Sequence, residues 1–278
     1  MRMSVPVSSE RLKWIKRKVL VANEGEFIVK CNEFKQSKRI LAEGDSWFSY
    51  PLGGGASNII LQLNSLYRPK DATILRKSSN GDEIAQMFAG NQKLENIQLL
   101  RDIHFDYFLV SGGGNDIVGV IDFELIVKKS NKAEPQPADF FNQELLNLRL
   151  DTIIMSYRNM LAYVRKFSKN KKIQIISHTY AYPRIKKGAK VLGLIEVGPW
   201  IAPFTSGIIP AAHHFKAIDY LIDQMAERLL ALADAEDNFH VIDTRKLVKA
   251  NQWNDEIHPT DKGFETIGQK FKEKIDSL

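Results

Sequence analysis

A serine and a histidine, far apart in the chain, each stand in a setting suited to nucleophilic catalysis. Ser46 follows the apolar run 39–43 after a Gly-Asp pair, and Asp255 precedes His258 by three residues. A serine hydroxyl attacks an ester when a base removes its proton, and a carboxylate beside that base fixes its orientation. The spacing predicts Ser46 as the nucleophile, His258 as its base and Asp255 as the residue that orients His258.

Two further positions could stabilise the oxyanion that forms during attack on an ester. Gly81 lies shortly after the apolar run 72–75, and Asn115 follows three glycines behind the run 106–110. A backbone N–H and a side-chain amide are typical oxyanion donors. Together with the backbone N–H of Ser46, they form the predicted oxyanion hole. Each segment taken alone also fits a plain turn or a helix cap.

The apolar runs before these residues have the character of buried strands. They span 39–43, 72–75, 106–110, 173–177 and 239–242, and segments of helical periodicity lie among them at 58–66, 145–167 and 215–233. This alternation predicts a parallel sheet covered by helices on both faces. Active sites of such sheets form at the carboxyl ends of the strands, where the catalytic candidates stand.

These stretches resemble the signature blocks of the SGNH hydrolases, also called GDSL esterases and lipases. The Gly-Asp-Ser at 44–46 is similar to the nucleophile block, and Gly81, Asn115 and His258 match the other signature positions. Trp47 stands where many members carry Leu. The resemblance implies a flavodoxin-like three-layer α/β/α sandwich with a five-stranded parallel sheet. It also implies a cofactor-independent serine hydrolase that cleaves carboxylic esters through an acyl-enzyme.

The resemblance covers roughly residues 38–275, so we expect a hydrolase-like domain at 36–278 behind a basic N-terminal extension, 1–35. Insertions fall near 119–142 and 185–212, and the second is rich in apolar side chains among Gly and Pro. We expect this second insertion to form an acyl-binding wall or a lid over Ser46, with packing on the core or a dimer contact as the alternative. The candidate substrate-binding residues are Trp47, Phe48, Tyr50, Trp200 and Phe204.

Composition and motifs narrow the class of protein. The chain has 278 residues, a formal charge of +6 and one cysteine, Cys31, which has no partner for an intramolecular disulfide. The basic residues are scattered, so we expect no nucleic-acid partner. The sequence has neither a signal-peptide core nor a membrane span, which predicts a cytoplasmic protein, although export without a cleavable signal stays open.

Neither a metal nor an organic cofactor is expected. His178, His213 and His214 lack the spacing of a metal-binding motif, and the glycine-rich stretches lack the continuation of a phosphate-binding or dinucleotide-binding loop. There is no Gly-x-Ser-x-Gly elbow of an α/β-hydrolase. The expected substrate is a small-molecule or lipid ester.

Three alternatives to a simple esterase stay open at this point. An acyltransferase could use the same residues with an alcohol as acceptor, and an effector could use them on lipid esters. A binding module without catalysis could keep the fold, with its action in the N-terminal extension or the insertions. The substrate and the oligomeric state are not determined by the sequence.

Overall fold

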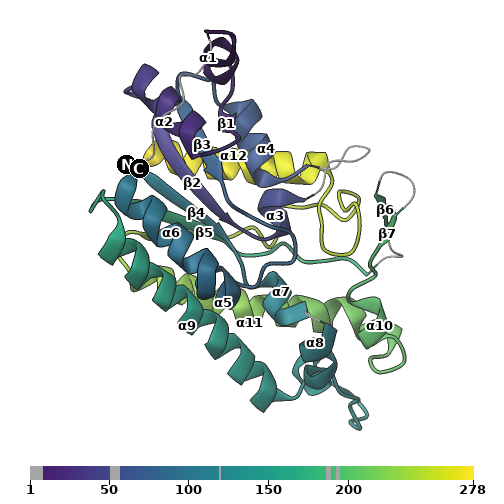
Figure 1. Ribbon diagram of the computed structural model, residues 1–278. Helices are drawn as coiled ribbons and strands as arrows, with labels where there is room; N and C mark the ends of the chain where they lie inside the picture. Colours follow the sequence, from purple (N-terminus) through teal and green to yellow (C-terminus); the bar gives the residue numbers. More distant parts are fainter. Residues whose placement is uncertain (1–8, 51–56, 119, 186–188, 192–194) are drawn as a thin grey trace.

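Six parallel strands form the sheet at the centre of the molecule, in the order β1-β3-β2-β4-β5-β8 (Figure 1). The computed structural model describes residues 9–50, 57–118, 120–185, 189–191 and 195–278. The strands of the sheet are β1 (Leu20–Val21), β2 (Lys38–Gly44), β3 (Ala72–Arg76), β4 (Tyr107–Ser111), β5 (Gln174–His178) and β8 (Phe239–Ile242). Five of them correspond to the predicted strands, and the parallel α/β architecture is confirmed.

The sixth strand comes from the N-terminal segment, so the prediction of a five-stranded sheet was one strand short. β1 has two residues and pairs with β3 at the edge of the sheet. Behind it, the ring of Phe27 is fully buried and packs on Phe105 with ring centroids 5.1 Å apart. Lys30 is buried too, and its ammonium donates to the carbonyl oxygen of Ala72 at 3.1 Å. The described part of this segment therefore packs on the sheet.

Helices cover both faces of the sheet (Figure 1). α4 and α12 lie together on one face, and α6, α9 and α11 lie on the other. The helices are α1 (Ser9–Lys16), α2 (Glu24–Glu33), α3 (Ser46–Ser49), α4 (Ile59–Leu66), α5 (Ile84–Met87), α6 (Gly90–Asp102), α7 (Gly114–Val118), α8 (Val120–Ile126), α9 (Gln143–Phe167), α10 (Ala202–Thr205), α11 (His214–Asp234) and α12 (Asp261–Ser277), with short 3₁₀ turns at Pro137–Phe140 and Ala211–His213.

The layers follow from hydrophobic periodicity. β4 is buried along its whole length and β2 from Ile40 onward, and their apolar stretches 107–110 and 40–42 are buried on both faces, as expected for parallel strands between two helix layers. α12 buries one stripe at helical spacing, namely Phe264, Ile267, Phe271 and Ile275. This stripe fills the space between α12 and the sheet. The carboxyl ends of the strands remain available for polar groups.

Both insertions add small elements beside the carboxyl edge of the sheet (Figure 1). The first contains α8 and returns through a β-bridge between Val127 and Phe141. The second contains the antiparallel strands β6 (Ala189–Val191) and β7 (Ile195–Val197), followed by α10. Both insertions thus lie where they can influence access to that edge.

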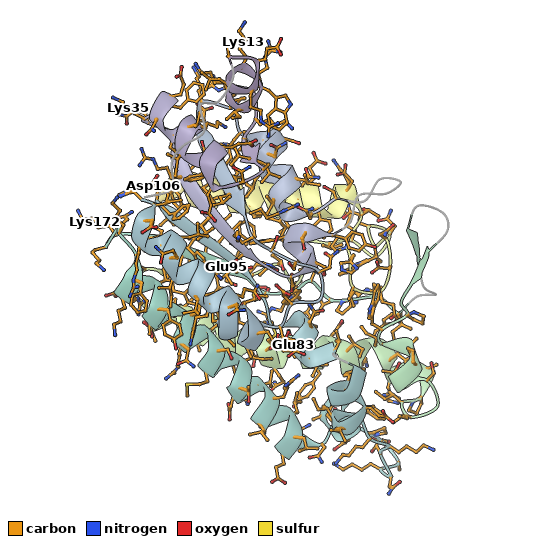
Figure 2. All side chains as sticks on the ribbon, in the orientation of Figure 1. Lys13, Lys35, Glu83, Glu95, Asp106 and Lys172 are labelled. Atoms are coloured by element: carbon orange, nitrogen blue, oxygen red, sulfur yellow. The ribbon has the colours of Figure 1, made fainter. Side chains whose placement is uncertain are left out.

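Figure 2 shows Lys13, Lys35 and Lys172 projecting from the surface, and all three are exposed. The basic stretch Lys186 to Lys190 begins outside the described residues. Within the described part of the chain, no helix is both long enough and apolar enough to span a membrane.

Candidate active site

Ser46 stands at the carboxyl end of β2, on the first residue of α3. The strand reaches this point through Gly44, where a Cβ atom would lie 2.7 Å from the carbonyl oxygen of Ser111 on β4. Only glycine allows the two strands to approach this closely. The Ser46 side chain is buried, and its Oγ atom lies 2.7 Å from Nε2 of His258.

Asp45 holds the nucleophile turn in place. Its carboxylate caps α3 by accepting the backbone N–H of Trp47 at 2.9 Å, and it accepts the hydroxyl of Ser111 at 2.6 Å. The phenol of Tyr180 donates to its other oxygen. A buried carboxylate with three donors is well solvated by the protein, so the turn that carries Ser46 is tied to both β4 and the segment after β5.

His258 and Asp255 form the second half of the site. Nδ1 of His258 lies 2.9 Å from Oδ2 of Asp255. The backbone N–H groups of Ile257 and His258 also donate to Oδ1 of Asp255, at 2.9 and 2.7 Å. The carboxylate therefore closes the turn and orients the imidazole at once. Ser46, His258 and Asp255 make one hydrogen-bonded row.

The environment of Asp255 keeps it ionised. Burial alone would raise its pKa, but the hydrogen bond and charge of His258, the phenol of Tyr50 and the N–H of Ile257 together lower the pKa below its usual value. Tyr50 donates to Oδ2 of Asp255 at 2.7 Å and receives the side-chain amide of Asn254 at 3.1 Å. The carboxylate beside His258 thus stays negative at neutral pH.

The segment around Gly81 is hydrogen-bonded both to Asn115 and to α3, which carries Ser46. The amide of Asn115 donates to the carbonyl oxygen of Asp82 at 2.9 Å, and the hydroxyl of Ser49 on α3 donates to the side chain of Asn80 at 3.0 Å. Gly81 has a φ of 83°, a conformation that favours glycine. An asparagine amide carries two N–H groups, so the bond to Asp82 leaves one for a ligand.

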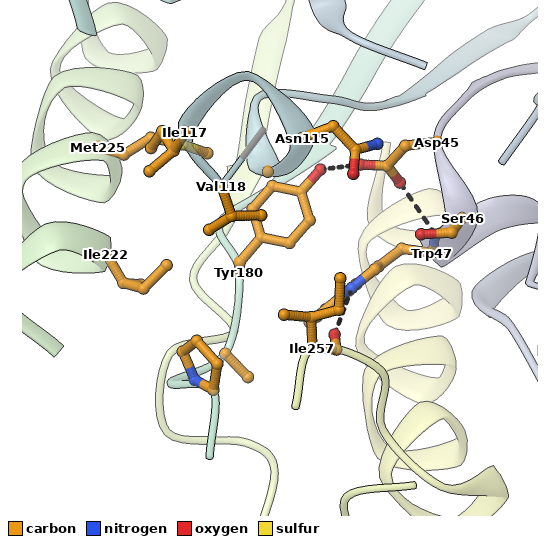
Figure 3. Close-up of a pocket in the computed structure, with 13 residues that line it drawn as sticks. Asp45, Ser46, Trp47, Asn115, Ile117, Val118, Tyr180, Ile222, Met225 and Ile257 are labelled. Carbon is orange, nitrogen blue, oxygen red and sulfur yellow. Dashed lines mark hydrogen bonds between the residues drawn. The ribbon is translucent and has the colours of Figure 1, made fainter. Parts of the chain in front are cut away.

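A pocket opens beside Ser46 (Figure 3). Its walls are mainly apolar and come from five parts of the chain: the nucleophile turn, α7, the segment after β5, α11, and the turn between Asp255 and His258. The described residues that line it are Asp45, Ser46, Trp47, Gly114, Asn115, Ile117, Val118, Tyr180, Ala181, Pro183, Ile222, Met225 and Ile257. Asn115 thus faces the same space as the nucleophile.

Solved structures with this architecture are known. The chain superposes on the lipase Lip_vut3 from a goat rumen metagenome with a TM-score of 0.55 and 15% identity, over 85% of this chain and 97% of that one. It superposes on a form of the acetyl xylan esterase Axe2 from Geobacillus stearothermophilus with a TM-score of 0.52 and 16% identity, over 86% and 95%. The fold is that of the SGNH hydrolases. No protein-family model and no curated protein sequence matches the chain.

Within this SGNH fold, the aromatic residues after Ser46 take different places. Trp47 lines the pocket, stacks on His178 with centroids 5.1 Å apart, and donates its indole N–H to the carbonyl of Ile257 at 3.0 Å. Phe48 is fully buried in the core against Phe271 and does not line the pocket. Tyr50 stacks on the ring of His258 at 3.9 Å and does not line the pocket either.

The second insertion reaches the site through Trp200. Its ring meets that of His258 edge to face, with centroids 5.4 Å apart and an angle of 80° between the planes. Ile201 and Ile209 of the same insertion are buried in the core. The side chain of Phe204, which was also expected at the site, lies outside the described part of the structure. The insertion therefore contacts the base directly and also packs on the core.

His178 is the last residue of β5 at the same edge, and its ring nitrogens are paired with groups other than Ser46. Its Nε2 lies 2.9 Å from the hydroxyl of Ser111, and its Nδ1 lies 2.6 Å from the carbonyl oxygen of Thr179. Burial lowers the pKa of His178, so the ring is neutral at neutral pH. It supports Trp47 from behind the pocket.

Sequence reasoning did not identify Tyr180, Ile222 or Met225 as site residues. Tyr180 follows β5 closely, so its position at a strand end could have marked it. Ile222 and Met225 look like ordinary core positions of an amphipathic helix. Among the described residues, no group of three or more His, Cys, Asp or Glu side chains could hold a metal ion.

Proposed function

We propose that the protein is a serine hydrolase that cleaves carboxylic esters through an acyl-enzyme. The observation that carries this proposal is the row from Oγ of Ser46 to Nε2 of His258, 2.7 Å, and from Nδ1 of His258 to Asp255, 2.9 Å. Nucleophile, base and orienting carboxylate stand within hydrogen-bond reach of one another, which is the geometry that activates a serine. Similarity to lipase and esterase structures supports the same general activity.

The proposed reaction uses these residues in sequence. His258 removes the proton of Ser46 as Oγ attacks the ester carbonyl carbon, and Asp255 stabilises the imidazolium that forms. The oxyanion receives hydrogen bonds from the N–H groups of Ser46 and Gly81 and from the amide of Asn115. The bond from the carbonyl carbon to the alcohol oxygen then breaks as His258 donates its proton to the leaving alcohol. Water attacks the acyl carbon and loses a proton to the same imidazole, which passes it to Oγ of Ser46 as the acyl–Oγ bond breaks and the acid is released.

A fluorophosphonate probe tests the proposal, because it reacts rapidly with an activated serine. We expect the probe to label Ser46 and Ser46→Ala to abolish both labelling and ester turnover. Ser65→Ala, which removes an exposed hydroxyl on α4, is the matched control and should keep both. Labelling at a different residue, or no labelling of the folded protein, would contradict a serine hydrolase at this site and favour a binding module.

A further inference from the structure

The pocket beside Ser46 has one polar end and one closed apolar end. Figure 3 shows Ser46 and Asn115 at one end, and Ile222 and Met225 of α11 at the other. Both α11 side chains are buried, with 6% and 2% of their surface exposed. A hydrocarbon chain of the substrate that enters the pocket from Ser46 therefore reaches these two residues with its far end.

The lining indicates which half of an ester enters. In the proposed reaction the leaving alcohol takes its proton from Nε2 of His258 and therefore departs on that side. His258 and Asp255 do not line the pocket, although Ile257 between them does, and Asn115, the expected oxyanion donor, lines it as well. The imidazole therefore stands outside the pocket, and the space extends from Ser46 and Asn115 toward α11. The acyl substituent is the group that fits into it.

The space is small. The pocket has a cavity volume of about 40 Å³. A cavity needs roughly 10–15 Å³ to hold one water, so this pocket accommodates about three groups of that size. Counted from the carbonyl carbon held at Ser46, three further carbon atoms make a butyryl group. An apolar lining also disfavours acyl groups with hydroxyl or charged substituents, which would lose their hydration there.

The walls are held in position. The phenol of Tyr180 is bound to Asp45, and its ring packs edge to face on Trp47 at 4.9 Å. Met225 packs on the backbone of the loop after β4. A Cβ atom added to Gly113 in this loop would lie 3.0 Å from Cε of Met225. Moving Tyr180 aside would break the support of the nucleophile turn. Widening the pocket for a longer acyl chain would therefore cost these contacts.

We propose that the protein selects esters of short apolar acyl groups, from acetyl to butyryl, and that Ile222 and Met225 set the upper limit of acyl length. This inference rests on the proposed serine hydrolase function. It assigns a specificity role to two residues of α11 that lie across the pocket from Ser46 (Figure 3).

The first measurement is a series of p-nitrophenyl esters on the wild-type protein, from acetate through butyrate and hexanoate to octanoate. We expect kcat/KM to be highest for acetate or butyrate and to fall by at least about tenfold at octanoate. A maximum at octanoate would overturn the length limit while leaving the hydrolase intact. Absence of turnover for every ester, together with an unlabelled Ser46, would overturn both proposals.

Variants at the closed end identify the residues responsible. Met225→Ala and Ile222→Ala should each raise the ratio of kcat/KM for octanoate to that for butyrate by roughly tenfold, because each opens space at the end of the pocket. Leu229→Ala is the matched control: it truncates a fully buried side chain one turn further along α11, outside the pocket. Should an alanine variant fail to fold, Ile222→Val must move the ratio in the same direction. A ratio that changes no more than in Leu229→Ala would overturn the role of α11.

A reversed series separates acyl from alcohol recognition. Alkyl acetates from methyl to octyl keep the acyl group constant and vary the alcohol. The ratio of octyl to methyl acetate should be the same in wild type and in Met225→Ala. A change in this series instead of the acyl series would place the alcohol in the pocket and overturn the assignment.

Discussion

The carboxylate of Glu256 accepts a hydrogen bond from the backbone N–H of Trp200, and this joins the second insertion to the turn that carries the proposed base. The N–H groups of Ile201 and Ala202 donate to the same carboxylate at 2.7 and 3.0 Å. Glu256 is fully buried, and the Trp200 ring packs on His258. Glu256 thus positions an aromatic neighbour of the base without touching the reacting atoms.

Glu256→Gln should loosen this attachment. Gln presents one acceptor oxygen and one NH₂ group, and the NH₂ group would face backbone N–H donors without a partner. We expect hydrogen exchange of the amides of residues 200–202 to accelerate at least about tenfold and kcat/KM to fall by roughly tenfold, as for a lost charge-assisted bond. Glu265→Gln, on the exposed face of α12, is the control and should change neither quantity.

A double-mutant cycle shows whether Glu256 acts through Trp200. In a Trp200→Ala background, Glu256→Gln should have little further effect on kcat/KM, because the ring that it positions is gone. If the two effects on the activation free energy simply add, Glu256 supports the catalytic turn by another route.

Tyr50→Phe should lower kcat and leave KM nearly unchanged. The substitution removes the hydroxyl that donates to Asp255 at 2.7 Å but keeps the ring stacked on His258. Losing one donor to a buried charge corresponds to about 1.5 kcal/mol, or roughly a tenfold loss of rate. Tyr67→Phe is a close control, since the Tyr67 hydroxyl donates to Asp276 on α12 at 2.9 Å. Equal losses in both variants would show a general effect on stability.

Asn115→Ala should reduce kcat by roughly 10²- to 10³-fold while the protein stays folded, because one oxyanion donor is removed. The labelling rate with a fluorophosphonate should fall in parallel. Asn91→Ala, an exposed position on α6, serves as the control. Activity within a few-fold of wild type would show that Asn115 only fixes the loop through its bond to Asp82.

His258→Ala should be far more damaging than any other histidine substitution. We expect kcat to fall by roughly 10⁴-fold or more, since the base is lost. His178→Ala should instead lower thermal stability through the lost stacking with Trp47, with a much smaller effect on kcat. His213→Ala and His214→Ala should leave kcat near the wild-type value. A His178 variant as inactive as the His258 variant would contradict this order.

Glu43 should make the stability of the protein depend on pH. It is fully buried at the end of β2, and burial raises its pKa from 4.5 to about 7 despite hydrogen bonds from Asn96, Gly44 and Gln92. The nearby charge of Asp82 acts in the same direction as burial. Between pH 4.5 and about 7 the folded protein binds a proton that the unfolded chain has released. Its free energy of unfolding therefore falls as pH rises through this window.

Glu43→Gln isolates this contribution, because Gln cannot ionise. The difference between 4.5 and about 7 corresponds to about 3 kcal/mol at most. We expect the free energy of unfolding of the variant, minus that of the wild type, to increase by up to about 3 kcal/mol from pH 5 to pH 8. Urea unfolding at the two pH values measures this difference. Asp116, whose pKa burial raises to about 6, acts in the same direction but is present in both proteins and cancels. A constant difference across the two pH values would contradict this account.

Much of the site follows from local sequence features. The blocks of Ser46, Gly81 and Asn115 follow soon after apolar runs, and the block of Asp255 and His258 follows further behind β8. Parallel strands bring their carboxyl ends to one edge, which favours a meeting of these blocks. The pairing of Asp255 with His258 is local as well, because three residues of turn bring the carboxylate to the ring. For these residues the order along the chain and the rule for parallel sheets were sufficient.

The contacts between segments far apart in the chain were decided only by the tertiary structure. Tyr50 and Asp255 are separated by 205 positions, and nothing in either segment indicates that a phenol would complete the carboxylate. Ile222 and Met225 have the spacing of a buried helix face, and this pattern cannot distinguish a face that packs on the core from one that closes a pocket. The two-residue strand β1 is too short to show an alternating pattern. Hydrophobic periodicity indicates which side chains become buried. Which residues they then contact depends on how elements distant in the sequence pack together.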